Sequence, residues 1–314
     1  MARIIILGAG GRLGAALLRE FAADHQVSGF NRAQLDLGDG GQLRETLGAL
    51  EFDLLVNCAA QTNVDRCEAE PAEAFALNAE APGLLAEICA TQGARLIHIS
   101  TDYIFEGAKT EPYTEEDEAR PISVYGESKL EGERRVLAVS GDHLVARVAW
   151  VFGPDRASFV DWIIQQAREK EEVAAVADKF STPTYTHDIA EMLRRLVVAG
   201  VADPGCASDV APAAGVGHPG YHGGIIHLTS RGSCTWQEYG QWALDCCLAK
   251  GMELRAERVG AISLADMKQF VARRPVYTVL STEKYERLTG QKPRTWQDAV
   301  RAYVRDHVAP TRAR

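Results

Sequence analysis

A tyrosine and a lysine stand four residues apart in the segment Tyr125-Gly-Glu-Ser-Lys129, the one Tyr-x-x-x-Lys in the chain. On a helix this spacing puts the phenol and the ammonium group on the same face. We expect the lysine cation to favour the phenolate and to lower the pKa of Tyr125 from about 10 toward neutrality. Such a tyrosine can deliver a proton to a carbonyl oxygen while a hydride reaches the carbonyl carbon. A surface pair without a catalytic role is the alternative.

Thr101 lies upstream of this pair, in Ser100-Thr101-Asp102 at the end of an apolar run. Its hydroxyl can hydrogen-bond the same carbonyl oxygen from another side. Thr101, Tyr125 and Lys129 therefore form a candidate catalytic group.

Three glycines, Gly8, Gly11 and Gly14, follow the first apolar run in Gly8-Ala-Gly-Gly-Arg-Leu-Gly14. Glycine lets the backbone turn sharply and approach a pyrophosphate, and the N-terminus of a following helix offers free N–H groups. The spacing differs from the usual G-x-G-x-x-G, so the position directly after a strand is the stronger indication. The motif predicts a dinucleotide site, and a tight strand–helix turn without a ligand is the alternative.

The choice of dinucleotide depends on the residues after the second apolar run, which are Asn31 and Arg32. An acidic residue there would bind a ribose 2′-hydroxyl, whereas an arginine can pair with a 2′-phosphate. Arg12 in the glycine loop adds a second guanidinium. The sequence therefore predicts NADPH as the preferred cofactor, with NADH also accepted, and an ordinary solvated Arg32 is the alternative.

The elements that must position these residues alternate between short apolar runs and helical patterns. Runs rich in Val, Ile and Leu, typical of strands covered on both faces, occur at residues 3–7, 26–30, 54–57, 95–100 and 143–149. Helices are expected at 14–23, 41–50, 70–92 and 125–140. This order predicts the α/β class, with a Rossmann-like doubly wound parallel sheet that binds ligands at the carboxyl ends of its strands.

The second half is less regular and predicts a smaller, discontinuous α+β lobe for the substrate. Helices are expected at 158–170, 186–199 and 295–308, and a strand at 225–229. We predict a dinucleotide-binding domain of residues 1–150, rejoined by about 186–230, and an interleaved substrate lobe within 151–314. Residues 202–224 predict a long loop, whose His218 and His222 are interpreted as solvated rather than metal-binding.

Composition excludes several classes of protein. Lys and Arg number 34 against 43 Asp and Glu, which gives a formal net charge of −9 and disfavours nucleic-acid binding. Seven cysteines without C-x-x-C or zinc-ligand spacing indicate free thiols in a reducing compartment. The apolar run near the start is too short for a signal peptide, and no run reaches the roughly 18 apolar residues of a membrane span. We therefore expect a cytoplasmic protein that has no membrane or nucleic-acid partner.

Six segments extend these motifs over nearly the whole chain. They are Val56-Asn-Cys-Ala-Ala-Gln-Thr-Asn-Val-Asp65, Ser100-Thr-Asp-Tyr-Ile-Phe-Glu-Gly107, Pro121-Ile-Ser-Val-Tyr-Gly-Glu-Ser-Lys-Leu130, Arg147-Val-Ala-Trp-Val-Phe-Gly153, Asp178-Lys-Phe-Ser-Thr-Pro-Thr184 and Arg274-Pro-Val-Tyr-Thr-Val-Leu280. With them the chain resembles the extended short-chain dehydrogenases/reductases, and within that group the dTDP-4-dehydrorhamnose reductases.

The resemblance implies a role for most of the candidate residues. It makes Tyr125 the proton donor and Lys129 the anchor of the nicotinamide ribose, and Thr101 completes the triad. It places Gly11, Arg12 and Leu13 at the pyrophosphate, Asp36 and Leu37 at the adenine, Ala60, Gln61 and Thr62 at the central part of the cofactor, and Thr101, Asp102 and Trp150 at the sugar. Arg273 and Arg274 are our own candidates for the substrate diphosphate, and a structural ion pair is their alternative.

The implied reaction is NAD(P)H-dependent reduction of the C4 keto group of a nucleotide-linked 4-keto-6-deoxysugar, from dTDP-4-dehydro-L-rhamnose to dTDP-L-rhamnose. The alternatives are a reductase or epimerase of another nucleotide sugar, or a non-catalytic regulatory subunit similar to the methionine adenosyltransferase β-subunit. Departures from the family pattern at Ser158 and at Phe180-Ser-Thr-Pro-Thr184 fall in the substrate half. Some members hold magnesium at a dimer contact through a Glu where this chain has Ala16, so no metal is expected and a homodimer stays open.

Overall fold

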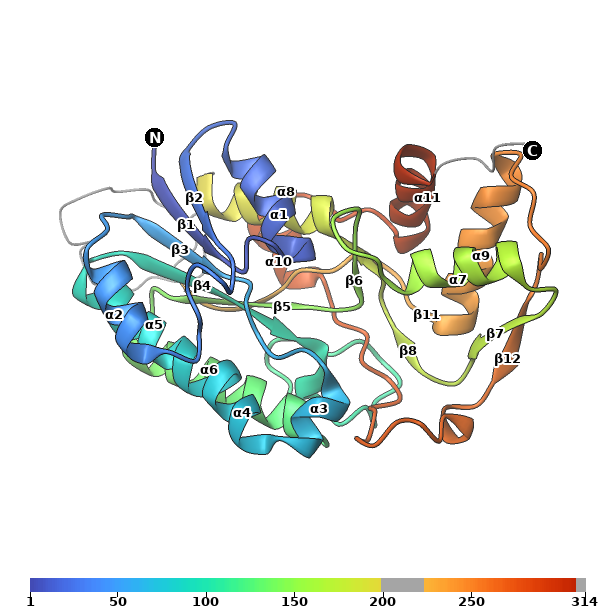
Figure 1. Cartoon of the computed structure of the whole chain (residues 1–314), viewed down its shortest axis with the longest axis horizontal. Coiled ribbons are helices and arrows are strands. Elements are labelled where there is room, and N and C mark those ends of the chain that lie inside the picture. Colours follow the sequence, from blue (N-terminus) through green and yellow to red (C-terminus); the bar gives the residue numbers. More distant parts are fainter. Residues whose placement is uncertain (199–222, 309–314) are drawn as a thin grey trace.

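The computed structural model describes residues 1–198 and 223–308, and its larger lobe is built on a six-stranded parallel sheet (Figure 1). The strands are β1 (Arg3–Leu7), β2 (Gln26–Phe30), β3 (Leu54–Asn57), β4 (Arg95–Thr101), β5 (Leu144–Val148) and β10 (Gly224–His227). Their order across the sheet is β10-β5-β4-β3-β1-β2. The predicted α/β class and doubly wound parallel sheet are confirmed, and each predicted strand is present with ends shifted by at most two residues.

The strand order explains where a ligand can bind. The chain passes from β1 outward to β2 and then returns to place β3 on the other side of β1. Adjacent crossovers then lie on opposite faces, so the carboxyl ends of β1 and β3 form the topological switch point at which sheets of this kind bind ligands. The glycine loop follows β1, and Ala60, Gln61 and Thr62 follow β3, so both predicted cofactor segments lie at this switch point.

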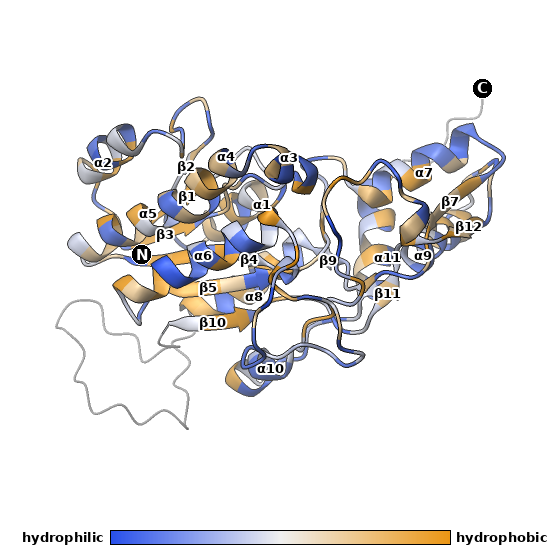
Figure 2. Cartoon of the chain, turned by 90° about the horizontal axis from the view of Figure 1, so that it is seen from below, coloured by the Kyte–Doolittle hydropathy of each residue, from blue (hydrophilic) through white to orange (hydrophobic). Residues whose placement is uncertain are grey.

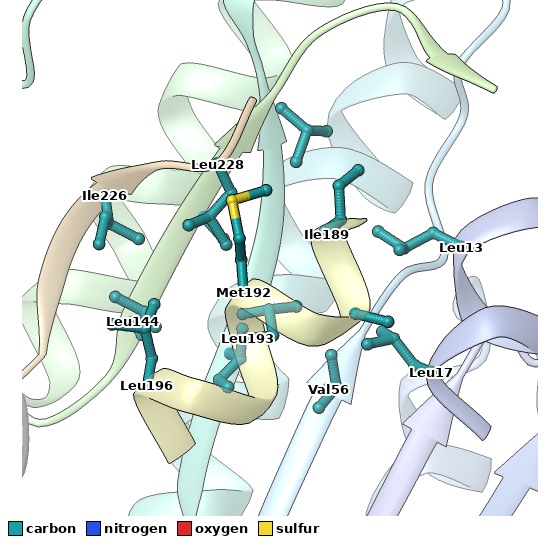
Figure 3. Packing of buried hydrophobic residues seen from close by; sticks show 14 of the residues in the cluster. Leu13, Leu17, Val56, Leu144, Ile189, Met192, Leu193, Leu196, Ile226 and Leu228 are labelled. Atoms are coloured by element: carbon teal, nitrogen blue, oxygen red, sulfur yellow. The ribbon is translucent and has the colours of Figure 1, made fainter. Parts of the chain in front are cut away.

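Successive residues of β1 are buried on opposite faces of the sheet. On one face Ile4 and Ile6 join a cluster with α1 (Arg12–Phe21), α8 (Thr186–Val198) and α10 (Glu283–Thr289). On the other face Ile5 and Leu7 pack with α2 (Gly40–Gly48), α5 (Ala81–Thr91) and α6 (Val124–Val139). Figure 3 shows the first cluster, where side chains of α8 and α1 meet those of the sheet strands. Burial on both faces is the reason the central strands are rich in apolar residues.

The helix expected at residues 70–92 differs from the prediction. The structure has α3 (Val64–Ala69), α4 (Pro71–Phe75), a π-helical turn (Ala76–Glu80) and then α5. A Cβ on Gly132 of α6 would collide with the carbonyl of Asn78, so α6 crosses this turn at the closest approach that glycine permits. π-Helical turns inside helices are frequent at functional sites, and this one places Asn78 beside the loop after β3.

The smaller lobe lies at one end of the molecule (Figures 1 and 2). It contains α7 (Phe159–Glu169), α9 (Trp236–Ala249) and α11 (Trp296–His307), whose apolar faces share one core with Phe152 and Tyr185. Its strands pair in twos: β7 (Val173–Val176) with β12 (Val259–Ile262), β6 (Val151–Phe152) with β9 (Thr184–Tyr185), and β8 (Phe180–Ser181) with β11 (Cys234–Thr235). The chain returns to the large sheet through α8 and β10.

Two further observations concern the sequence predictions. Most of the loop expected at 202–224, with His218 and His222, lies outside the described residues. Among residues 1–198 and 223–308, no helix has the length and apolar content that a membrane crossing requires.

Candidate active site

The glycine loop joins three strands at the switch point. Gly8 has a left-handed backbone, with φ of +75°, and the N–H groups of Gly8 and Ala9 both donate to the carbonyl of Phe30, over 2.9 and 3.0 Å. A Cβ on Gly8 would lie 2.9 Å from the nitrogen of Ala59, and one on Gly14 would collide with the carbonyl of Gly8. Glycine is required at both positions because no side chain fits between loop, helix and neighbouring strand.

Helix α1 begins without a cap. Its N-cap residue Gly11 makes no side-chain hydrogen bond, and its first turn holds no acidic residue. The N–H of Gly11 donates to the carbonyl of Gly8 over 2.8 Å, so the N–H groups of Arg12 and Leu13 are the ones that can receive an anion, and the partial positive charge of the helix end favours one. Both the glycine loop, where Gly8 and Gly14 leave no room for a side chain, and the uncapped start of α1 fit the pyrophosphate of a dinucleotide.

The guanidinium of Arg12 is not placed as predicted. It donates to the carbonyls of Val151, Arg156 and Ala157, over 3.0, 3.0 and 2.6 Å. These three carbonyls accept the N–H groups of the guanidinium, so the Arg12 side chain joins α1 to the start of the smaller lobe. The expectation of a second cation beside a 2′-phosphate is therefore wrong.

Arg32 remains the cation at the end of β2. Its side chain is 72% exposed and lies 3.4 Å from a carboxylate oxygen of Asp36. The other Asp36 oxygen accepts from the N–H of Gly38 over 2.9 Å, and Leu37 is buried beside it. The carboxyl end of β2 is therefore flanked by the solvated guanidinium of Arg32 and by the apolar side chain of Leu37.

A buried asparagine, Asn78, holds the loop after β3, and sequence reasoning missed it. Its Oδ1 accepts from the N–H of Gln61 over 2.8 Å, and its Nδ2 donates to the carbonyl of Gln61 and the hydroxyl of Ser128. Ala60 and Gln61 are half-buried and Thr62 is exposed. The structural feature that marks Asn78 is the π-helical turn around it, and the pattern of apolar residues in the sequence does not distinguish such a turn from an ordinary helix.

Tyr125 and Thr101 are brought together at the carboxyl edge of the sheet. Tyr125 lies in the first turn of α6, after the N-cap Ser123, and its side chain is buried. The hydroxyl of Thr101, at the end of β4, hydrogen-bonds Tyr125 and acts to lower its pKa. Burial has the larger effect and raises the pKa of Tyr125 above its ordinary value, so the expected shift toward neutrality is wrong for the protein without ligand.

Lys129 lies one turn further along α6 and is fully buried. Its Nζ donates to the carbonyl of Ile99 over 2.7 Å and lies 3.1 Å from Nε2 of His98. Desolvation lowers the pKa of Lys129 to about 8. A pKa of about 8 leaves Lys129 mostly protonated at neutral pH, and the group loses its charge only above that pH.

Asp102 does not present a free carboxylate to a substrate. It accepts hydrogen bonds from the hydroxyls of Thr101, Ser181 and Thr278, over 3.2, 2.9 and 2.5 Å. The side chain is buried, and desolvation raises its pKa while Lys179 acts in the opposite direction. Because these partners come from both lobes, Asp102 fastens the end of β4 to the smaller lobe.

Trp150 has the one positive φ of a non-glycine residue in the described chain, at 36°. It packs between Trp236 and Tyr239, and the ammonium of Lys179 lies 5.8 Å from its ring centre. Its buried Nε1–H has no hydrogen-bond partner among the described residues. Backbone strain and an unpaired donor are features that persist at ligand sites.

The two candidate arginines differ. Arg274 donates to Asp65 over 2.8 Å and stacks on Phe270, so the ion-pair alternative holds for it. The N–H groups of Val271 and Ala272 bond the same carboxylate, each over 2.9 Å. Arg273, which lies between Ala272 and Arg274, is exposed. No group of three His, Cys, Asp or Glu side chains within residues 1–198 and 223–308 is arranged for a metal ion.

Tyr125 and the glycine loop share the carboxyl edge of one parallel sheet, an arrangement that defines a Rossmann-type reductase of the short-chain dehydrogenase/reductase class. The chain belongs to the dTDP-4-dehydrorhamnose reductase family, because the family model described as the RmlD substrate binding domain matches residues 2–308.

Relatives agree with this assignment. A dTDP-4-dehydrorhamnose reductase of Burkholderia thailandensis is 34% identical over 97% of this chain and 98% of its own length. A probable dTDP-4,6-dihydroxy-2-methyloxan-3-one 4-ketoreductase of Streptomyces antibioticus is 35% identical over 99% of this chain and 98% of its own. The crystal structure of the Bacillus anthracis dTDP-4-dehydrorhamnose reductase in complex with NADP is similar, with a TM-score of 0.84 and 27% identity over 97% of this chain and 99% of that one.

Proposed function

We propose that this protein reduces the C4 keto group of a dTDP-linked 4-keto-6-deoxysugar with NAD(P)H, converting dTDP-4-dehydro-L-rhamnose to dTDP-L-rhamnose. The observation that carries the proposal is the pairing of the Thr101 and Tyr125 hydroxyls at the sheet edge that also bears the glycine loop. Family membership gives the substrate class, since relatives of full length carry that activity in their names.

The chain provides a site for the cofactor at each position along the switch point. Gly8, Gly11, Arg12, Leu13 and Gly14 would hold the pyrophosphate, Arg32, Asp36 and Leu37 the adenosine, Ala60, Gln61 and Thr62 the central portion, and Lys129 the nicotinamide ribose. When bound, the dihydronicotinamide supplies the hydride.

Tyr125 supplies the proton. Burial keeps its phenol protonated, so the hydroxyl can donate to the substrate oxygen as negative charge develops there. Thr101 can donate its one O–H to the same oxygen by turning it away from Asp102, which accepts it over 3.2 Å in the structure. The residues therefore divide into a donor, a second hydrogen-bonding group and a support.

We assign the substrate side to Trp150 and Arg273. The unpaired indole N–H of Trp150 is a donor for a sugar hydroxyl, and the exposed Arg273 can pair with the diphosphate. A cytoplasmic location and a homodimer are further parts of the proposal that rest on the sequence alone.

The test is oxidation of NADPH by the purified protein with a panel of nucleotide sugars. We expect turnover with dTDP-4-dehydro-L-rhamnose above that with UDP-linked or 3-keto analogues. The Streptomyces antibioticus relative favours a second candidate, another dTDP-linked 4-keto sugar, which the same panel would reveal. Absence of turnover with every sugar, together with co-purification of an adenosyltransferase, would support a regulatory subunit instead.

A further inference from the structure

Arg12 connects the expected cofactor site to the smaller lobe. It is the first residue of α1, so its backbone N–H has no hydrogen-bond partner within the helix and can receive an anion. Its guanidinium donates to the carbonyls of Val151, Arg156 and Ala157, over 3.0, 3.0 and 2.6 Å. One residue thus contributes a backbone donor to the cofactor site and a side chain to the segment that leads into the substrate lobe.

The three carbonyls lie in the segment 151–157, which leads from the large sheet into α7 (Figure 1). The segment begins directly after Trp150, the residue assigned to the sugar, and ends directly before Ser158, the N-cap of α7. The N–H and the hydroxyl of Ser158 both donate to Asp161, over 2.7 and 2.8 Å, so the first turn of α7 is closed onto the end of the segment. A movement of the segment would therefore displace both Trp150 and α7.

Two arginines of α1 hold this segment, and Arg12 has the larger share. Its charged donors bind three carbonyls in a half-buried setting, where charge-assisted hydrogen bonds are stronger than at a solvated surface. Arg19, two turns further along the helix, donates to both carboxylate oxygens of Asp155 over 2.6 and 2.8 Å, but its side chain is 51% exposed, and exposed ion pairs contribute little. Elsewhere in the segment, a Cβ on Gly153 would collide with Thr186 at the start of α8. The segment is therefore confined by α1 and α8, with Arg12 as its main polar contact to α1.

We infer that Arg12 is a positioning residue that couples cofactor binding to the arrangement of the substrate lobe, and the inference rests on the proposed function for the identity of the two ligands. The uncapped first turn of α1 is free to fray until an anion occupies its N–H groups. A bound pyrophosphate fixes the backbone of Arg12, so its side chain no longer loses that freedom when it holds the segment 151–157. Cofactor binding should therefore order this segment, and with it Trp150.

The coupling acts in both directions. Linkage requires that a ligand which orders the segment 151–157 strengthens cofactor binding by the same factor by which the cofactor strengthens the binding of that ligand. A contact that only stabilises the fold would behave differently, because loss of the Arg12 guanidinium would then loosen the segment to the same extent with and without the cofactor. The response of the segment to NADPH therefore distinguishes the two roles.

Hydrogen exchange of the full chain, followed by mass spectrometry, tests the coupling directly with NADPH as the probe. In the wild type we expect NADPH to slow exchange at least tenfold in peptides that cover the segment 151–157 and the first turns of α7. In Arg12→Gln, which keeps the backbone N–H and loses the guanidinium, NADPH should still bind, and the slowing in these peptides should fall below twofold. Arg12→Lys keeps the charge and loses the planar fork of donors, and it replaces Arg12→Gln with the same expected result if that variant does not fold.

Arg255→Gln is the matched control. Arg255 holds the other end of α7, where it donates to the carbonyl of Glu169 and to the carboxylate of Glu171, each over 2.8 Å, so its loss should leave the effect of NADPH on the segment 151–157 unchanged. Equal slowing in the wild type and in Arg12→Gln, or no slowing in the wild type, would overturn the inference. Turnover measured on the same samples separates this result from the proposed function. An effect of NADPH that depends on Arg12, without turnover of any sugar, would refute only the reaction, whereas turnover with equal slowing in both proteins would refute only the coupling.

Discussion

Ser181 in the smaller lobe donates a hydrogen bond to the Asp102 carboxylate over 2.9 Å, at the end of the strand that carries Thr101. Thr278 donates to the same carboxylate, and the fully buried Lys179 provides the nearby positive charge. The ammonium of Lys179 also donates to the carbonyl of Pro275 over 2.8 Å. The position of Thr101 therefore depends on how the two lobes meet.

Lys179→Met tests this junction through stability. The pKa of Lys179 is about 8 in the folded protein and 10.5 as its ordinary value, so the unfolded chain binds more protons between these limits. Stability that depends on Lys179 should therefore rise with pH. The wild type and Lys179→Met differ in their free energy of unfolding, and this difference should change in favour of the wild type by about 2 kcal/mol from pH 8 to 10. The change follows from about 1.4 kcal/mol per pH unit for each proton that only the unfolded chain binds.

Urea unfolding at several pH values measures this difference. Lys170→Met, at an exposed lysine after α7, is the control and should show no such gain. A constant difference between wild type and Lys179→Met across the range would mean that Lys179 is not held in a desolvated site.

Arg32→Ala tests the choice of cofactor. We expect the wild type to prefer NADPH over NADH about tenfold, or about 1.4 kcal/mol, because one exposed guanidinium pairs weakly with a 2′-phosphate. The variant should raise the KM for NADPH and leave that for NADH nearly unchanged. Steady-state kinetics with both cofactors decides, with Arg44→Ala on the exposed side of α2 as control. A preference that survives Arg32→Ala would make Arg32 an ordinary surface residue.

Arg273→Ala tests the assignment of the substrate diphosphate. We expect the KM for the nucleotide sugar to rise about tenfold, or about 1.4 kcal/mol, while the KM for NADPH and the melting temperature stay the same. Lys268→Ala removes another exposed cation of the same segment and should leave the KM unchanged. Equal effects of the two substitutions would indicate general electrostatic attraction rather than a specific contact.

The sequence predicted the sheet because burial on both faces of β1, β3, β4 and β5 leaves predominantly apolar runs. It predicted the glycine loop because close backbone approach restricts residue type. Both signals are local. The meeting of Thr101 with Tyr125 followed from parallel topology, which places the carboxyl ends of the strands on one edge.

The partners of the charged site residues could not be predicted in this way. Asp102, Arg12 and Arg274 find their acceptors and donors 79, 139 and 209 residues away in the chain. The raised pKa of Tyr125 and the lowered pKa of Lys129 arise from desolvation, which depends on packing that no spacing reports. The sequence therefore indicated which residues gather at the site and not the charge state in which the fold holds them.

The central claim is that Tyr125 gives its proton to the C4 oxygen, and the most direct measurement is turnover of dTDP-4-dehydro-L-rhamnose by Tyr125→Phe, with NADPH binding measured separately. Phenylalanine keeps the ring and has no proton to give, so kcat should fall about 10²–10⁴-fold while the cofactor still binds. Tyr103→Phe, at the buried ring 5.7 Å from that of Tyr125, is the control and should keep most of its turnover. Near wild-type turnover by Tyr125→Phe would contradict the assigned chemistry.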